Sequence, residues 1–304
     1  MPAYFVGIDI GGTWIKAVAV DRDGSLIEEA TTATEDADPQ WADRVRGLCE
    51  QLETGLPKPA SGIGVAAPGL ANPEGSCINW MPGRLPGIEG LVWRDFLDRR
   101  HEVPVLNDAH AALLGEIWKG AAEGCRDVVL LTLGTGVGGA VICDGKLLRG
   151  HIGRAGCVGH ISLDPDGEPD ICKTPGSLEQ AIGDCTVAER SFGRFSSTQE
   201  LVRAYRASDA AAKDIWLRSV RQLAAGIASI VNVVDPQVVI IGGGTAQAGE
   251  NLLEPLEDAL SQFEWRPGGR RVELRLAEMG DLSGAYGAAY YAIQKDTSLK
   301  AGKE

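Results

Sequence analysis

The strongest constraint on the fold of this chain is a stretch of sequence that occurs twice in related form. Residues 7–27 read GIDIGGTWIKAVAVDRDGSLI, and residues 130–150 read LLTLGTGVGGAVICDGKLLRG. Each copy predicts a β-strand, a Gly/Thr turn, a second strand, an Asp-Gly turn and a third strand. Because self-similarity indicates a repeated architecture, we expect two related halves that each begin with a β-meander.

The rest of the chain alternates apolar strands with helical segments, which is typical of the α/β class. A chain of 304 residues is long enough for two domains. We expect an N-terminal α/β domain over residues 1–118 and a C-terminal α/β domain over residues 119–284. A closing helix at about 285–295 is expected to pack back on the first domain. The Gly-, Pro- and Asn-rich residues 70–91 predict a long loop between strands.

Both glycine turns can bind phosphate. The first is Gly11-Gly12-Thr13 after Asp9, and the second is Gly134-Thr135-Gly136-Val137-Gly138. Glycine lets the backbone approach a phosphate and point several N–H groups at it, while Asp9 can hold a Mg²⁺-bound water. For one such turn alone, a tight hairpin is the better interpretation; two in matching contexts favour phosphate binding. Neither is a Walker motif or a Rossmann fingerprint, because no Gly-Lys-Ser/Thr follows and a strand succeeds the glycines.

Two further segments have a structural and a functional interpretation. Asn107-Asp108 opens a predicted helix, so either residue can be a simple N-cap. Alternatively, a carboxylate held there can take the proton from a substrate hydroxyl during phosphoryl transfer. Gly242, Gly243 and Gly244 follow a buried strand and form either an ordinary strand-to-helix turn or a flat wall for a nucleotide. The residues alone leave both questions open.

The charge and cysteine content exclude several classes of protein. The net charge is −13, which makes the chain a poor general binder of nucleic acid or anionic membrane. The seven cysteines are scattered and form no C-x-x-C pair, which is typical of reduced thiols. No signal peptide and no membrane-spanning apolar window are recognised, so we expect a cytoplasmic protein.

Six segments occur in a fixed order along nearly the whole chain: DIGGT at 9–13, APG at 67–69, LNDAHAALLGE at 106–116, LGTGVGGAVICDG at 133–145, AGCVGH at 155–160 and DPQVVIIGGG at 235–244. Together they resemble the ROK family (repressor, open reading frame, kinase). The resemblance implies a two-domain actin/hexokinase-like (ribonuclease H-like) α/β fold, with a duplicated βββαβα core and ATP in the interdomain cleft. Family repressors carry an added N-terminal DNA-binding domain, for which this chain has no room before residue 9, so the resemblance implies a kinase.

The same resemblance implies roles for individual residues. Asp108 matches the catalytic base, and ATP with Mg²⁺ is the implied cofactor. The residues that match the two phosphate motifs and the adenosine motif are Asp9, Gly11, Gly12, Thr13, Gly134, Thr135, Gly136, Gly138, Gly242, Gly243 and Gly244. The residues that match sugar contacts are Asn79, Asn107, Asp108, His160 and Glu179.

The chain departs from the family pattern in two places. Cys157 stands where the family has a glutamate that binds sugar hydroxyls, and a thiol cannot accept two hydrogen bonds as a carboxylate does. We therefore interpret Cys157 as a small buried side chain. In the family zinc motif C-x-C-G-x-x-G-C-L-E, two of three thiolates become Asp170 and Ser177. Only Cys172 and His160 remain, so we expect no structural zinc.

Three functions are compatible with these observations. The first is an ATP-dependent kinase for a hexose or amino sugar, glucokinase-like, which the intact Asp108 and both phosphate turns favour. The second is a catalytically weak sensor of a sugar or nucleotide, which the departures at Cys157 and at the zinc motif favour. The third is an actin- or chaperone-like ATPase, which the short length disfavours. The resemblance implies a homodimer or homotetramer as the assembly.

Overall fold

The computed structural model describes residues 3–296, which divide into two compact units. Within the described range, unit 1 consists of 3–124, Arg149–Ala155 and 279–296. Unit 2 consists of Cys125–Leu148 and Gly156–Glu278. The chain therefore leaves unit 1, builds unit 2 and returns. None of the described helices is long and apolar enough to cross a membrane.

Unit 1 is built on a five-stranded mixed sheet with the strand order β3-β2-β1-β4-β7. Its first three strands form an antiparallel meander, whereas β4 runs parallel to β1 and β7 runs parallel to β4. A two-residue strand, β5, pairs with β6 beside the sheet. The strands span β1 Tyr4–Ile10, β2 Trp14–Asp21, β3 Leu26–Ala33, β4 Gly62–Ala67, β5 Leu70–Ala71, β6 Ile78–Trp80 and β7 Val105–Asn107.

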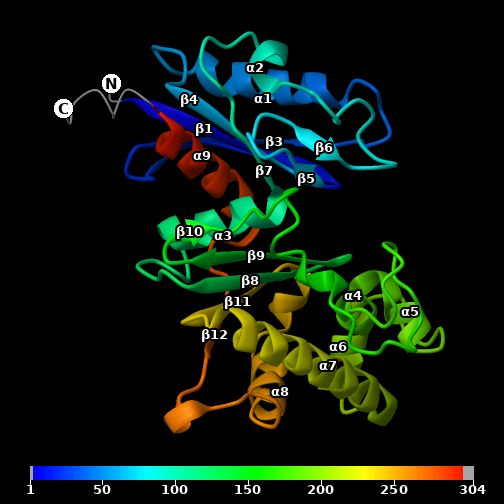
Figure 1. Ribbon diagram of the computed structural model, residues 1–304. Coiled ribbons are helices and arrows are strands. Elements are labelled where there is room, and N and C mark those ends of the chain that lie inside the picture. Colours follow the sequence, from blue (N-terminus) through cyan, green and yellow to red (C-terminus); the bar gives the residue numbers. More distant parts are fainter. Residues whose placement is uncertain (1–2, 297–304) are drawn as a thin grey trace. The chain divides into compact units, whose positions relative to one another are not determined.

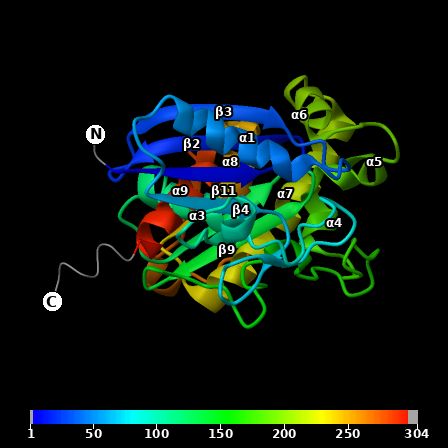
Figure 2. The ribbon, with the colours of Figure 1, turned by 90° about the horizontal axis from the view of Figure 1, so that it is seen from above.

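Helices cover both faces of this sheet (Figure 1). One face carries α1, which lies across β2 and β3 as Figure 2 shows, and the other carries α9 with α3 against it. Two sheet glycines let α9 approach closely, since a Cβ on Gly7 or Gly64 would collide with the carbonyl oxygens of Ala285 or Ala288. The helices span α1 Trp41–Thr54, α2 Trp93–Phe96, α3 Asp108–Lys119 and α9 Ser283–Lys295.

Unit 2 repeats the plan of unit 1. Its sheet has the order β10-β9-β8-β11-β12, in which β8, β9 and β10 form an antiparallel meander and β11 runs parallel to β8 and to β12. The long helix α7 places the fully buried Trp216 in the core of this unit. The elements span β8 Val128–Leu133, β9 Val137–Cys143, β10 Lys146–Leu147, β11 Val238–Gly242, β12 Glu273–Leu276, α4 Leu178–Ile182, α5 Val187–Arg190, α6 Thr198–Arg206, α7 Ala210–Val234 and α8 Glu250–Leu260.

The duplicated strand–turn–strand pattern confirms the α/β class predicted from the sequence, and both sheets share one topology. Local differences have physical reasons. Residues 70–91 contain the short β5–β6 hairpin, because Leu70 and Ala71 pair with Trp80 and Ile78. Strand β9 begins at Val137, directly after the glycine turn, since Val137 already pairs with Leu133. The domain boundaries expected from the sequence remain a prediction.

Candidate functional site

The first glycine turn of unit 1 is a tight corner between β1 and β2. The N–H of Gly11 donates to the carbonyl of Trp14 (3.0 Å), and the Thr34 hydroxyl donates to the carbonyl of Gly11 (2.7 Å). A Cβ on Gly12 would lie 2.8 Å from the Arg84 guanidinium, so this position has space only for glycine unless the arginine moves. Thr13 is exposed at the tip of the turn. The corner therefore presents its backbone to solvent beside a cationic side chain.

Two carboxyl groups define the acidic part of unit 1: Asp9, which is half-buried, and Asp108, which solvent can reach. The side chain of Asp9 lies against the start of α9, because a Cβ on Gly284 would lie 2.5 Å from the Asp9 carboxylate. Burial, and then the charge of Asp108, raises the pKa of Asp9 to about 7 against the opposing effect of Lys16. Burial also raises the pKa of Asp108, although hydrogen bonds from Ala109 N–H and Asn107 oppose that shift. Ionisation of both carboxyl groups is unfavourable, as their raised pKa values show. Such pairs of shifted pKa values are typical of a functional site.

Asn107 and Asp108 divide the two roles that the sequence left open. Asn107 is the N-cap of α3, because its side-chain oxygen accepts the N–H groups of Ala109 (3.0 Å) and His110 (3.3 Å). Its amide nitrogen donates to the carbonyl of Gly69 (3.1 Å), which ties the start of α3 to the APG segment. Asp108 Oδ1 also accepts the N–H of Ala109 (2.8 Å), so both side chains contact the first turn of α3, with Asn107 as its N-cap.

Asn79 lies on β6 and is exposed. Its side-chain oxygen accepts a weak hydrogen bond from the Cys77 thiol at 3.6 Å. Among residues 3–296, no hydrogen bond or ion pair joins Asn79 to Asp9, Asn107 or Asp108. The charge of Asp108 affects the pKa of Asp9 within unit 1, whereas Asn79 lies on a separate hairpin.

The second glycine turn lines a cavity of about 600 Å³ in unit 2. The backbone N–H groups of Asp184 and Cys185 donate to the carbonyls of Gly134 (3.0 Å) and Thr135 (2.9 Å). The segment that follows α4 therefore fixes the position of the turn. Gly134 and Thr135 line the cavity together with Gly244, which joins two motifs separated by about a hundred residues. This cavity is large enough for a small ligand.

The other glycines of unit 2 shape the same region. Gly243 has a φ of 82° and a Cβ there would lie 2.5 Å from the carbonyl oxygen of Leu133, so only glycine fits without strain. Gly242 ends β11 and pairs with Thr132, and Gly138 pairs with Thr132 from the other side. Gly136 lies against the Glu179 carboxylate, which a Cβ on Gly136 would strike. These glycines are required by close approach rather than by flexibility.

Sequence reasoning missed one side of this cavity. Helix α6 and its N-cap contribute Ser197, Thr198, Arg203 and Arg206 to the lining, and Asp184 lies beside them. In the sequence, α6 is a short helix with strongly segregated polar and apolar faces, which is indistinguishable from an ordinary surface helix. Two arginines on a cavity lined by glycine turns are suited to an anionic ligand.

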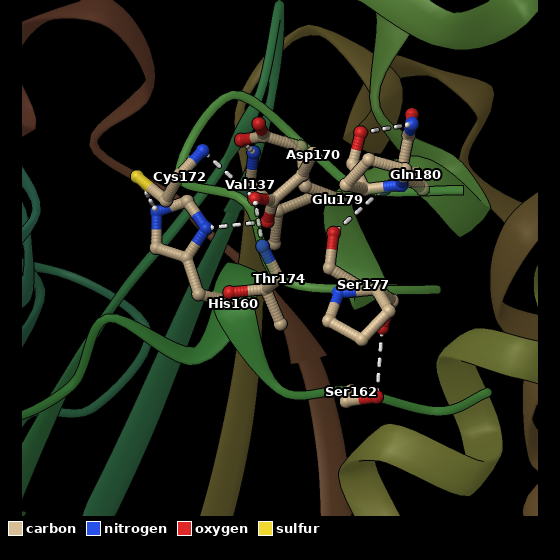
Figure 3. A network of polar contacts seen from close by, with 11 residues as sticks. Val137, His160, Ser162, Asp170, Cys172, Thr174, Ser177, Glu179 and Gln180 are labelled. Carbon is tan, nitrogen blue, oxygen red and sulfur yellow. Dashed lines mark hydrogen bonds and ion pairs between the residues drawn. The ribbon is translucent and has the colours of Figure 1, made fainter. Parts of the chain in front are cut away.

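His160 and Glu179 belong to one polar network of unit 2 (Figure 3). The carboxylate of Glu179 accepts the N–H of Val137 at 2.9 Å, which links α4 to the second glycine turn. His160 Nδ1 lies 2.7 Å from Asp170 Oδ2, and His160 Nε2 lies 3.5 Å from the Cys172 sulfur. Burial alone would raise the pKa of Asp170, but hydrogen bonds from His160, Thr174 N–H and Ser177 outweigh it and lower that pKa. Burial, with the charges of Asp170 and Glu179, raises the pKa of the Cys172 thiol.

Cys157 follows Gly156, which has a φ of 89° and packs against the backbone of Gly139 and Ala140. The side chain of Cys157 is half-buried rather than fully buried. It stands beside the short turn Val158–His160, three residues before His160. The substitution therefore lies next to the polar network and does not belong to the interior of the core.

The fold and these features agree with comparisons to known proteins. The model of the ROK family matches residues 5–295, and the chain belongs to this family. A glucokinase of Halalkalibacterium halodurans is 30% identical, over 99% of this chain and 98% of that protein.

Solved structures of relatives have the same architecture. The ROK hexokinase of Thermus thermophilus has a TM-score of 0.85 at 31% identity, covering 97% of this chain and 99% of that chain. A ROK glucokinase of Streptomyces griseus in complex with glucose and AMPPNP has a TM-score of 0.79 at 28% identity, covering 96% of this chain and all of that chain. The fold is therefore the actin/hexokinase-like α/β fold expected from the sequence.

Proposed function

We propose that the protein is an ATP-dependent sugar kinase that transfers the terminal phosphoryl group of ATP to a sugar hydroxyl. The proposal rests first on membership of the ROK family, with a glucokinase matched over nearly the full length of both chains. The observation that carries the chemistry is the position of Asp108 at the start of α3, where desolvation raises the pKa of a carboxylate that solvent can still reach. Kinase catalysis needs such a residue to accept the proton of the attacking hydroxyl.

Asp108 is the proposed general base. Desolvation raises the pKa of its carboxyl group above the usual range, and a carboxylate with a higher pKa accepts a proton more readily. Asn107, fixed between the N–H groups of α3 and the carbonyl of Gly69, is proposed to bind a sugar hydroxyl from a rigid position. Asn79, His160 and Glu179 are the further proposed sugar ligands.

The cavity of unit 2 is the proposed nucleotide site. The backbone of Gly134–Gly138 would bind phosphate groups, and Gly242–Gly244 would lie against the nucleoside. Arg203 and Arg206 supply positive charge, which explains how a chain with a net charge of −13 holds a triphosphate. The reaction then requires the base of unit 1 to meet the nucleotide bound by unit 2, and closure around the substrates would exclude water.

Unit 1 is suited to a divalent cation. The Asp9 carboxyl has a pKa raised to about 7, so its ionised form lacks sufficient compensating charge, which a cation would supply. We propose that Asp9 holds Mg²⁺ through a water molecule, beside the Gly11-Gly12-Thr13 corner. When bound with ATP, the ion would neutralise charge that develops on the phosphate groups.

Cys157 favours one alternative function, a sensor that binds a sugar but phosphorylates it poorly. The test is a panel of hexoses and N-acyl amino sugars in a coupled assay of ADP release, together with calorimetric measurement of sugar binding. A kinase phosphorylates at least one sugar, and Asp108→Asn abolishes that turnover while sugar binding persists. The matched control is Asp43→Asn, which changes an exposed acid in the first turn of α1. Binding without turnover in the unaltered protein would select the sensor.

A further inference from the structure

Asp170 is the most completely hydrogen-bonded side chain of the loop between His160 and α4. Its side chain is 1% exposed. One carboxylate oxygen accepts the N–H groups of Cys172 (2.8 Å) and Thr174 (2.9 Å), and the other accepts Nδ1–H of His160 (2.7 Å). The Ser177 hydroxyl also lowers the pKa of this carboxyl group. Figure 3 shows His160, Cys172 and Thr174 converging on Asp170.

These residues occupy the four positions at which the family motif places the ligands of a zinc ion: His160, Asp170, Cys172 and Ser177. As a donor set they do not fit structural zinc, which takes four Cys or His ligands in nearly all cases. The Ser177 hydroxyl is a neutral oxygen that already accepts the N–H of Gln180 at 3.2 Å. Both oxygens of Asp170 are engaged by N–H donors. His160, Asp170 and Cys172 each bring one ligand atom within 4.8 Å of the others, so only three donors would face an ion, and one of them is a carboxylate oxygen that already accepts hydrogen bonds.

We propose that the Asp170 carboxylate replaces the metal, so that a network of hydrogen bonds holds residues 160–179 in the arrangement the site needs. We name His160, Asp170, Cys172, Thr174 and Ser177 the carboxylate clasp. A carboxylate only accepts hydrogen bonds, so His160 donates through Nδ1 and its Nε2 is left as an acceptor. The Cys172 thiol, 3.5 Å away, is the donor to that nitrogen. Every polar group of the clasp thereby has a partner without an ion.

The clasp connects the loop to the second glycine turn. Ser177 is the N-cap of α4 and accepts the N–H of Gln180, which sets where this helix begins. Glu179 is the second residue of α4, and its carboxylate accepts the N–H of Val137 in the turn region. Backbone bonds from Leu178 N–H to the carbonyl of Ile161 (2.9 Å) close the loop from the other side. We therefore assign Asp170 as a positioning residue for His160 and Glu179. This assignment rests on the proposed sugar-kinase function, in which those two residues bind the sugar.

The first experiment converts the clasp into a metal site. Asp170→Cys combined with Ser177→Cys supplies three thiolates and one imidazole at the four positions. We expect this double variant to retain one zinc ion per chain after dialysis, whereas the unaltered protein retains none, by elemental analysis. This readout does not depend on kinase activity. Stoichiometric zinc in the unaltered protein, with ordering of residues 160–179 lost on chelation, would overturn the proposal.

The second experiment removes the acceptor. Asp170→Ala leaves three donors without a partner, and we expect faster hydrogen exchange over residues 160–179 and a sugar KM raised about tenfold with kcat changed less. The control is Asp166→Ala, which removes an exposed acid of the same loop and is expected to change neither quantity. The cysteine double variant is expected to regain the original KM when zinc is added, since the metal then restores the clasp.

The two readouts separate the clasp from the function proposed above. Rapid exchange in Asp170→Ala, together with zinc uptake by the double variant, supports the clasp even if no sugar is phosphorylated. Unchanged exchange over residues 160–179 in Asp170→Ala refutes the clasp even if the kinase is active. If exchange rises but the KM stays unchanged, the positioning of His160 and Glu179 by Asp170 is refuted.

Discussion

The two glycine turns arise from the same repeated unit but lie among different charged side chains. The turn of unit 1 follows Asp9 and lies in a region with Asp108, two acids whose pKa values are raised, and beside Arg84. The turn of unit 2 lines a cavity with Arg203 and Arg206. Identical backbone plans have thus acquired different side chains. This difference supports the proposal that one copy serves proton transfer and a cation, and the other binds an anion.

The largest expected effect tests the acid side of this comparison. Asp108→Asn keeps the shape and the N-cap of α3 but removes the base, so kcat should fall by about 10²–10⁴-fold while KM for ATP changes little. Steady-state kinetics measure both constants. In the unaltered protein, kcat should also fall as the pH drops through the raised pKa of Asp108, because the protonated acid cannot accept a proton. A kcat of Asp108→Asn within tenfold of the unaltered value would remove this residue from the role of base.

The next largest effect tests the backbone of the nucleotide side. Gly243→Ala forces a Cβ onto a residue with a φ of 82° and against the Leu133 carbonyl. We expect the free energy of unfolding to fall by about 1–3 kcal/mol, measured by urea denaturation. Gly244→Ala is the matched control, since a Cβ there meets nothing within 4 Å. Its stability should stay within about 0.5 kcal/mol of the unaltered protein. Equal losses in both variants would contradict the close-approach argument.

A third prediction concerns the cost of burying Asp9. The pKa of Asp9 is 3.8 in the unfolded reference and about 7 in the folded chain. Between these values the unfolded chain has lost a proton that the folded chain keeps, so the free energy of unfolding falls as the pH rises. Asp9→Asn should remove this decline and be more stable than the unaltered protein by about 1–2 kcal/mol at pH 8.

Thermal or urea unfolding at pH 4 and pH 8 checks this prediction, because the gain should be present at pH 8 and absent at pH 4. Asp43→Asn, at an exposed site of the same unit, provides the control. If Asp9→Asn is less stable than the unaltered protein at pH 8, neighbouring groups stabilise the ionised Asp9 carboxylate and the prediction is wrong.

The smallest expected effect sharpens the anionic preference of unit 2. Arg203→Ala removes one positive charge from the cavity, and we expect KM for ATP to rise about fivefold with no change in stability. Arg270→Ala removes an exposed arginine outside the cavity of the same unit and should leave KM unchanged. Kinetics at two salt concentrations supply a second check, since screening should reduce the difference between the two variants.

The sequence predicts the sheets of this protein better than the walls of its sites. The repeated meander and Gly11, Gly12, Gly134 and Gly136 are local patterns, which strand periodicity and turn chemistry reveal. The choice between Asn107 and Asp108 as N-cap was open, because both side chains can accept the N–H groups of α3 and only coordinates identify the acceptor.

The lining of the cavity and the surroundings of Asp170 depend on long-range packing, which the sequence alone does not reveal. Arg203 looks like any arginine of an amphipathic helix until the fold brings α6 beside Gly134 and Gly244. Asp170 could be aligned with a family cysteine, but the three hydrogen bonds of its carboxylate depend on a turn in which Lys173 has a φ of 69°. Such a backbone conformation is rare for lysine and gives no clear signal in the sequence.

The way α9 completes the first sheet has a consequence for biosynthesis. The strands that α9 covers are made first on the ribosome, whereas Ser283–Lys295 is made only after all of unit 2. Until then, Gly7 and Gly64 expose the groove that receives the helix. Unit 2, whose residues lie mostly in one continuous stretch, can acquire its structure during translation. The amino-terminal half must wait for the synthesis of α9 before its core is sealed.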